Sequence, residues 1–228
     1  YWDEPIEVCA ILIKDKKIDS IFHKYIKPYK RIPKDVEKLT GITNEQLTKE
    51  ENKYKILPEL RKFIGDNVVV AHNAKFDVDF LNFWFLKMNT PVIQKNICTM
   101  KAFRKITGRK KNSTLTDACE YFDIDLSSAH SAIADTKATA NLFIKELDYD
   151  DALKVESSTE EDIFIRIKSR IYKSTPYRKV KEDLCGGKIN IGRRRKIETV
   201  EDSLNVIDMF KKSYIIEEIS SRLNIEEV

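Results

Sequence analysis

The chain of 228 residues lacks long apolar runs and a large excess of charge of either sign. No stretch approaches the ~20 apolar residues that a membrane-spanning helix needs, and no basic-then-apolar signal peptide begins the sequence. Net charge is only +4, with 34% charged and 42% hydrophobic residues. That excess is too small to require a nucleic-acid partner, although local basic clusters can still bind one. The composition therefore predicts a soluble protein without a membrane partner.

Cysteine is also sparse. The four cysteines, Cys9, Cys98, Cys119 and Cys185, are scattered without the spacing of metal ligands. Free thiols in a reducing compartment are the simplest interpretation, which predicts a cytoplasmic location. The sequence also contains no internal repeat and no low-complexity segment. A chain of this length can form one sizeable core with a small appendage.

The apolar pattern indicates an α/β fold. An apolar run over 6–13 and an alternating run over 18–26 predict a hairpin with Lys16 and Lys17 between the strands. Short strands are expected at 68–71 and 96–99. The expected helices are 32–39 with Gly41 as its stop, 55–64, 74–88, 115–122 and 131–147. An antiparallel pair followed by alternating helices and short strands favours α/β.

One candidate for chemistry is Asp77, in the segment 71–77 that directly follows the apolar run at 68–70. On the helix expected from Ala74, Asp77 shares a face with Leu81 and Trp84. A buried carboxylate is costly unless it is hydrogen-bonded, paired or bound to a metal. For Asp77 alone, a first-turn aspartate favoured by the helix macrodipole is an equally good interpretation.

The second candidate segment runs from His130 to Asp135 and leads into the helix expected at 131–147. Five residues along a helix correspond to a rotation of about 140°. The two side chains can therefore serve one site if His130 precedes the helix and Asp135 lies in its first turns. For each residue alone, a surface histidine and a solvated aspartate are the simpler interpretation.

The full strings around these residues change that balance. His-Asn-Ala-x-Phe-Asp-x-x-Phe-Leu at 72–81 and His-Ser-Ala-Ile-Ala-Asp at the start of 130–143 resemble the second and third motifs of the DEDDh 3'–5' exonucleases. These are the DnaQ-like branch of the ribonuclease H-like fold. Further strings at 32–43, 97–100 and 115–121 are typical of the family, and their order and spacing make the resemblance specific. It covers residues 3 to about 147 and implies a ribonuclease H-like mixed sheet flanked by helices.

The resemblance implies two-metal phosphodiester hydrolysis, with two Mg²⁺ or Mn²⁺ ions about 3.5–4 Å apart that clamp the terminal phosphodiester. Asp77 and Asp135 would hold the metal, since hard oxygen ligands suit these ions. His130 would be the general base that takes the proton of the attacking water.

Candidate substrate-binding residues come from the second motif and from a basic loop. They are Asn73, Phe76, Arg109, Lys110 and Lys111. Basic side chains near the site would contact phosphates, which position a strand without reading its sequence. A merely solvated basic loop is an equally good interpretation.

The family's first motif, Asp-x-Glu, does not occur at the expected place. It would align just before residue 1, and Asp3-Glu4 aligns after it. The resemblance puts the missing strand centrally, between the strand at 6–13 and the one ending at Ala71, so its absence would leave ladder groups unpaired on both sides. We expect the natural protein to begin earlier and the chain as given to be inactive or nearly so.

Two classes of function compete. The leading hypothesis is an exonuclease that releases nucleotides from the 3' end of single-stranded DNA or RNA, with a polymerase or a helicase as a further partner. The alternative is a non-catalytic module that binds nucleic acid or protein on an exonuclease fold. Retention of Asp77, His130 and Asp135 argues against the alternative. DNA and RNA both stay open, because discrimination depends on contacts to the 2'-OH.

The acidic break at 148–151 is the predicted end of the exonuclease domain, which spans 1–148. Residues 149–198 are interpreted as a linker or accessory region, in which Thr159 with Asp162 favours a helix over a strand. Residues 199–228 are interpreted as a small α-helical appendage that resembles a partial helix-turn-helix of helicase type, and a plain αα-hairpin is an equally good interpretation. The basic run at 193–196 is a candidate phosphate contact.

Overall fold

An antiparallel hairpin opens the fold in the computed structural model, which describes residues 4–126, 131–149 and 151–173. Strand β1 (Glu7–Lys14) pairs with β2 (Lys17–Tyr25) along its whole length. Asp15 and Lys16 form the turn with φ values of 49° and 58°, the positive values that a two-residue turn of type I′ requires at both central positions. The predicted hairpin is confirmed. Its turn lies one residue earlier than expected, because Lys17 already pairs with Lys14.

Three short helices follow the hairpin. They are α1 (Lys34–Thr40), α2 (Asn44–Thr48) and α3 (Lys53–Ile64). Gly41 ends α1 with a φ of 72°, a conformation that glycine adopts without steric cost. The side chain of Asn52 begins α3 by accepting a hydrogen bond from the backbone N–H of Tyr54, as polar N-caps do. The predicted helices here and the stop at Gly41 are confirmed.

Three strands form a second sheet in the order β3–β4–β5. Their bounds are Val69–Ala71, Lys95–Cys98 and Val155–Ser157. β3 and β4 are parallel, whereas β4 and β5 are antiparallel. Strand β5 was not predicted, because three residues carry too little alternation to reveal a strand. It extends this sheet beyond the acidic break at 148–151.

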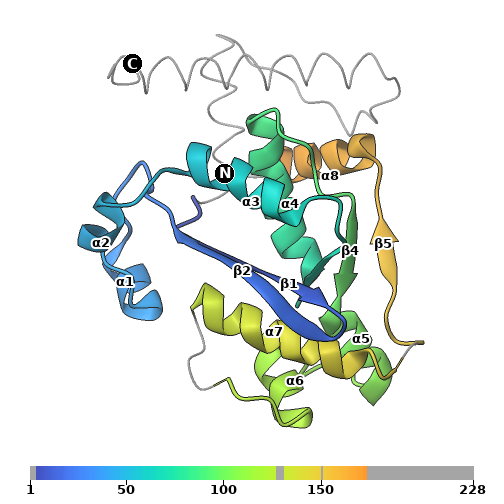
Figure 1. Cartoon of the computed structure of the whole chain (residues 1–228). Helices are drawn as coiled ribbons and strands as arrows, with labels where there is room; N and C mark the ends of the chain where they lie inside the picture. Colours follow the sequence, from blue (N-terminus) through green and yellow to red (C-terminus); the bar gives the residue numbers. More distant parts are fainter. Residues whose placement is uncertain (1–3, 127–130, 150, 174–228) are drawn as a thin grey trace. The chain divides into compact units, whose positions relative to one another are not determined.

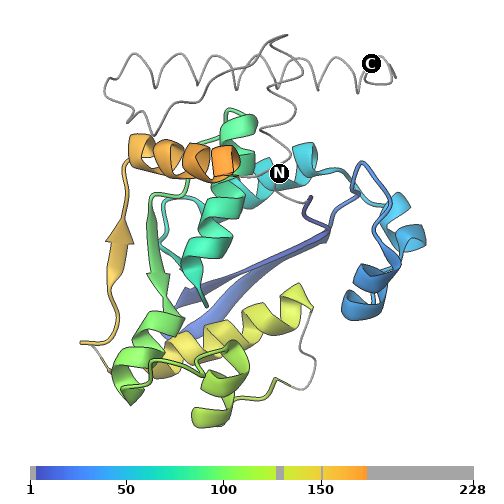
Figure 2. The ribbon, with the colours of Figure 1, turned by 180° about the vertical axis from the view of Figure 1, so that it is seen from behind.

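The hairpin and the second sheet do not pair with each other (Figures 1 and 2). Among the described residues, β1 pairs only with β2, and β3 pairs only with β4. Each of these two strands therefore keeps one edge whose backbone N–H and C=O groups have no strand partner. Such edges leave strong donors and acceptors in need of partners.

Four helices accompany the strands: α4 (Ala74–Lys87), α5 (Thr99–Thr107), α6 (Leu115–Tyr121) and α7 (Ala132–Glu146). Helix α7 packs along β1 and also contacts β2 and β3, so a single helix touches both sheets. It also packs on α5 and α6. The core that these helices share consists of Phe103, Ala118 and Leu142, bordered by Leu115, Phe122 and Ile124. The expected mixed α/β fold is confirmed.

A second compact unit combines residues 83–92 with the described residues from Thr159 on. It contains the end of α4 and helix α8 (Glu160–Lys173). Asp162 donates its backbone N–H to the Thr159 hydroxyl at 3.1 Å, and that hydroxyl donates to the Asp162 carboxylate at 2.8 Å. This cap explains why a helix forms, and the predicted helix is confirmed. The basic run at 193–196 and the helix pair predicted at 199–228 lie outside the described residues.

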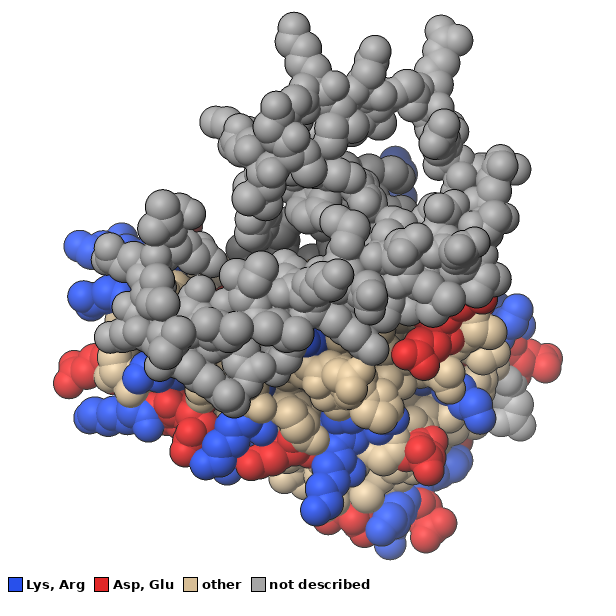
Figure 3. Space-filling model, turned by 90° about the horizontal axis from the view of Figure 1, so that it is seen from above, with Lys and Arg blue, Asp and Glu red and all other residues tan. Residues whose placement is uncertain are grey.

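Charged side chains of both signs are interspersed on the described surface that Figure 3 shows. This mixture fits a chain with 41 basic and 37 acidic residues. Among the described helices, none combines the length and the apolar character needed to cross a membrane.

Glu146, in the last turn of α7, is fully buried. Neither of its carboxylate oxygens has a hydrogen-bond partner in the part of the chain that the structure describes. Burial penalises the charged form and raises the pKa of this carboxyl to about 8. The folded protein therefore holds a proton there that the unfolded chain releases at much lower pH.

We predict that Glu146→Met stabilises the protein, and more so at alkaline pH. The stability that the protonated carboxyl allows is fully present below the ordinary glutamate pKa and is lost as pH rises through about 8. Removing a buried unsatisfied group of this kind is worth about 1–3 kcal/mol. Urea unfolding at pH 5, 7 and 9 measures the effect, with the exposed Glu120→Met as the matched control. An equal gain at all three pH values would contradict the assignment.

Candidate active site

The second motif forms the connection between β3 and α4. Asn73 takes the left-handed conformation with a φ of 71°, and its carbonyl oxygen accepts a hydrogen bond from the N–H of Phe76 at 2.8 Å. This turn puts Asp77 in the first turn of α4. We expected Asp77 to share a buried face of α4, but its side chain is exposed. Helix α4 instead turns the neighbouring Val78 and Asp79 inward.

Although water reaches Asp77, enough protein surrounds it to affect its ionisation. Desolvation raises the pKa of the Asp77 carboxyl to about 6, and a hydrogen bond from its own backbone opposes the shift. A divalent cation beside the carboxylate would also oppose the shift, because an opposite charge favours the ionised form.

His72, the first residue of the second motif, has a structural role. Its Nε2 lies 2.9 Å from the carbonyl oxygen of Ser113, and its Nδ1 lies 3.0 Å from the hydroxyl of Thr99. A carbonyl only accepts, so Nε2 donates to Ser113, and the Thr99 hydroxyl donates to Nδ1 in the neutral ring. Burial lowers the pKa of His72, which keeps the ring neutral. The motif's histidine therefore ties the end of β3 to the start of α5 and to the loop before α6.

We predict that His72→Ala destabilises the protein by about 1–3 kcal/mol at pH 7, because it leaves the buried Thr99 hydroxyl and the Ser113 carbonyl without this partner. The lowered pKa adds a pH dependence. The stability from the neutral ring is present above the ordinary histidine pKa and is lost as pH falls through the lower folded value. Urea unfolding between pH 5 and 8 measures both effects. The acid loss should be smaller in the variant, and equal acid profiles would contradict the prediction.

The third motif begins helix α7. Ser131 is its N-cap, and the Ser131 hydroxyl accepts a hydrogen bond from the N–H of Ala134 at 3.2 Å. Asp135 lies in the first turn and donates its N–H to the carbonyl oxygen of Ser131 at 3.0 Å. Burial raises the pKa of the Cys119 thiol on α6, and the nearby charge of Asp135 adds to the shift. The predicted helix is confirmed, whereas His130 lies outside the described residues.

The two acidic candidates thus occupy equivalent places on two helices. Asp77 is in the first turn of α4, which follows β3, and Asp135 is in the first turn of α7, which packs against β3. Convergence of the two carboxylates with His130 stays a prediction.

The predicted substrate-binding residues have different surroundings. Phe76 is 60% exposed, so its ring is accessible from solvent. The Arg109 guanidinium lies over the rings of Phe103 and Tyr121, at 5.6 and 5.7 Å from the ring centroids. Asn73, Lys110 and Lys111 are exposed. Their contacts with substrate stay a prediction.

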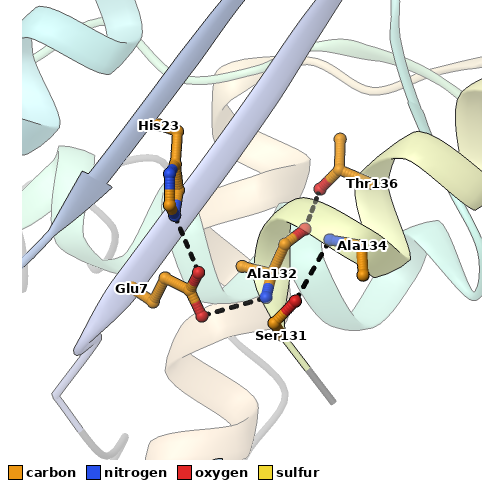
Figure 4. A network of polar contacts seen from close by, with 6 residues as sticks. All are labelled: Glu7, His23, Ser131, Ala132, Ala134 and Thr136. Atoms are coloured by element: carbon orange, nitrogen blue, oxygen red, sulfur yellow. Dashed lines mark hydrogen bonds and ion pairs between the residues drawn. The ribbon is translucent and has the colours of Figure 1, made fainter. Parts of the chain in front are cut away.

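One contact near the site was missed by sequence reasoning. The carboxylate of Glu7, the first residue of β1, accepts a hydrogen bond from the N–H of Ala132 at 2.9 Å and lies 2.7 Å from Nε2 of His23 (Figure 4). Glu7 thus joins the hairpin to the start of α7. A glutamate in an apolar strand was the signal that could have drawn attention to this position.

The donor set suits a hard cation but is incomplete in the described residues. Asp77 and Asp135 offer the carboxylate oxygens that Mg²⁺ and Mn²⁺ prefer. Within 4–126, 131–149 and 151–173, however, no group of three or more His, Cys, Asp or Glu side chains is placed to hold an ion. Among the described residues β1 and β3 each have one edge without a strand partner; the strand that the resemblance puts between them stays a prediction.

Comparisons with known proteins identify the family. The model of the exonuclease family RNase_T matches residues 1–143. The PolC-type DNA polymerase III of Bacillus subtilis (strain 168) is 36% identical over 148 residues, which are 64% of this chain and 10% of that protein. The DNA polymerase III subunit epsilon of Aquifex aeolicus (strain VF5) is 32% identical over 146 residues, 64% of this chain and 72% of that subunit. The chain therefore spans about a tenth of the PolC-type relatives and most of the epsilon subunit.

Solved structures agree on the fold. The nuclease domain of 3'hExo, a DEDDh family member bound to rAMP, superposes with a TM-score of 0.60 at 19% identity, covering 68% of this chain and 86% of that domain. Exonuclease X in complex with 5' overhanging duplex DNA gives a TM-score of 0.52 at 20% identity, covering 71% and 90%. At these identities the likeness concerns the fold, whereas the family match rests on sequence. The chain belongs to the exonuclease family RNase_T, and its fold is that of a DEDDh exonuclease domain.

Proposed function

We propose that this exonuclease domain removes nucleotides from the 3' end of single-stranded DNA next to a polymerase. The observation that carries the proposal is the placement of Asp77 and Asp135 in the first turns of two helices that meet at β3, one by following it and one by packing on it. Because α4 follows β3 and α7 packs on β3, the proposal has the two carboxylates converge on one region. Two carboxylates there are suited to hold cations on a phosphodiester.

In this mechanism Asp77 and Asp135 would hold divalent metal ions through their carboxylate oxygens. When bound, two divalent ions supply charge stabilisation at the phosphorus and lower the pKa of the attacking water. His130 accepts the proton of that water, for which a pKa near neutrality is suited. The cap by Ser131 and the hydrogen bond from Ala132 to Glu7 fix the start of α7, which directly follows His130 in the sequence.

DNA is the favoured substrate because the PolC-type protein and the epsilon subunit, at 36% and 32% identity, are both DNA polymerase III proteins. Exposed Phe76 offers a ring on which a terminal base can stack, a contact that every base can make. Lys110 and Lys111 offer cations for the phosphates that follow. The same two relatives make a polymerase the proposed partner. The chain matches 10% of the PolC-type protein, which fits a proofreading domain within a larger polymerase.

Activity further requires two carboxylates that the sequence does not contain at the expected place. We expect an Asp-x-Glu strand to insert between β1 and β3, where it would pair with the two unpaired edges. The inserted strand would also merge the two sheets into one mixed sheet.

The test compares the chain as given with the same chain extended at its N-terminus by a strand bearing Asp-x-Glu-Thr-Thr-Gly. We expect the extended protein to release mononucleotides from a labelled single strand with Mg²⁺ or Mn²⁺, and the shorter chain to release few or none. In the extended protein, His130→Ala should lose on the order of 10²–10⁴-fold in rate with binding largely kept, as expected for a general base. The readout is gel or chromatographic analysis of the released nucleotide.

Asp135→Asn should cause a comparable loss, whereas Asp66→Asn, at an exposed turn, is the matched control and should keep the rate. Full activity in EDTA, or in Asp135→Asn, would overturn the two-metal proposal. Tight strand binding without any release by the extended protein would instead favour the non-catalytic binding module.

A further inference from the structure

Glu7 lies where the hairpin meets the third motif. Its side chain is only 7% exposed, so its carboxylate needs partners to compensate for the loss of water. Both oxygens have one. Oε1 lies 2.7 Å from Nε2 of His23, and Oε2 accepts the N–H of Ala132 at 2.9 Å (Figure 4). The carboxylate therefore bridges β2 and α7.

A carboxylate oxygen accepts hydrogen bonds, so Nε2 of His23 is the donor in its contact with Oε1 of Glu7. The ring of His23 also lies edge-on to Tyr25, with 5.1 Å between the centroids. His23 is thus held from two directions, and it in turn orients the carboxylate toward α7.

On α7, Glu7 acts as a cap supplied by another element. The first N–H groups of a helix have no partner within the helix. Ser131 satisfies the N–H of Ala134, and Glu7 satisfies the N–H of Ala132, the first helical residue. The negative carboxylate also lies at the positive end of the helix dipole, where it is favourable.

Helix α7 also packs along β1, the strand that begins with Glu7. Within α7 the Thr136 hydroxyl donates to the carbonyl oxygen of Ala132 at 2.6 Å, which ties the first helical residue to the following turn.

We propose that Glu7 is a positioning residue for the exonuclease reaction: it fixes the first turn of α7 on the hairpin and thereby sets the place of Asp135. The proposal rests on the proposed function for its role in the reaction. Asp135 follows Ala132 by three residues, and its N–H closes on the carbonyl of Ser131 at 3.0 Å. A shift of that turn displaces its carboxylate, and small misplacements of reacting groups cost large factors in rate.

The first test needs no catalysis. Amide hydrogen exchange is measured in the chain as given for Glu7→Ala, Glu7→Gln and the control Asp19→Asn, which removes an exposed carboxylate of the same hairpin paired with Lys14. Glu7→Ala should speed exchange at Ala132 and Ala134 about fivefold or more, as loss of a cap does. Glu7→Gln should restore most of the protection, because an amide oxygen still accepts from Ala132. Asp19→Asn should change neither amide.

The second test uses the N-terminally extended protein. Glu7→Ala should lower kcat about tenfold or more with little change in KM, since misplacing a catalytic group affects the reaction rather than strand binding. Glu7→Gln should recover much of kcat. If the extended protein is inactive, the proposed function fails. Independently of activity, unchanged amide exchange at Ala132 and Ala134 in Glu7→Ala would show that Glu7 does not position the first turn of α7. Uniformly faster exchange over all helices in Glu7→Ala would also overturn the proposal, because Glu7 would then act on global stability alone.

Discussion

The fold depends on the packing of α7 against strands of two separate sheets. Backbone hydrogen bonds hold each sheet internally, yet none joins β1 to β3 among the described residues. Helix α7 contacts both strands. Side-chain packing on α7 therefore connects the two sheets, which backbone hydrogen bonds would do in a continuous sheet. Burial of apolar surface is non-directional. Directional polar contacts such as that of Glu7 with Ala132 therefore contribute to the specific placement of α7.

The same helix shows how position along one element decides what an acidic side chain does. Asp135, in the first turn, lies near the positive end of the helix dipole, where a negative charge is favoured. Glu146, in the last turn, lies near the negative end and is fully buried, and desolvation raises its pKa to about 8. Burial thus keeps the Glu146 carboxyl neutral, whereas Asp135 is the candidate to hold a cation. The difference follows from environment and not from residue type.

Much of the fold could be predicted because its elements carry strong local signals. The hairpin, the stop at Gly41 and helix α7 follow from alternation, a glycine in the left-handed region and an apolar helical stripe. Strand β5 could not be predicted, since its three residues gain their structure from pairing with β4. The exposure of Asp77 was missed for a related reason. Helical periodicity gives the relative directions of side chains, but tertiary packing decides which direction is the interior.

The site was predictable only in the parts that form continuous strings. Asp77 and Asp135 stand in strings with recognisable spacing, whereas the groups that hold them in place are far away in the sequence. His72 is held by Ser113, which is 41 residues away, and Glu7 contacts Ala132 across 125 residues. A single buried polar residue carries no periodicity, so its partner becomes visible only when the chain is folded. A glutamate at the start of an apolar strand nevertheless has a physical implication by itself. Its burial is costly without a donor, and a helix N-terminus with unsatisfied N–H groups is a donor that every α/β fold provides.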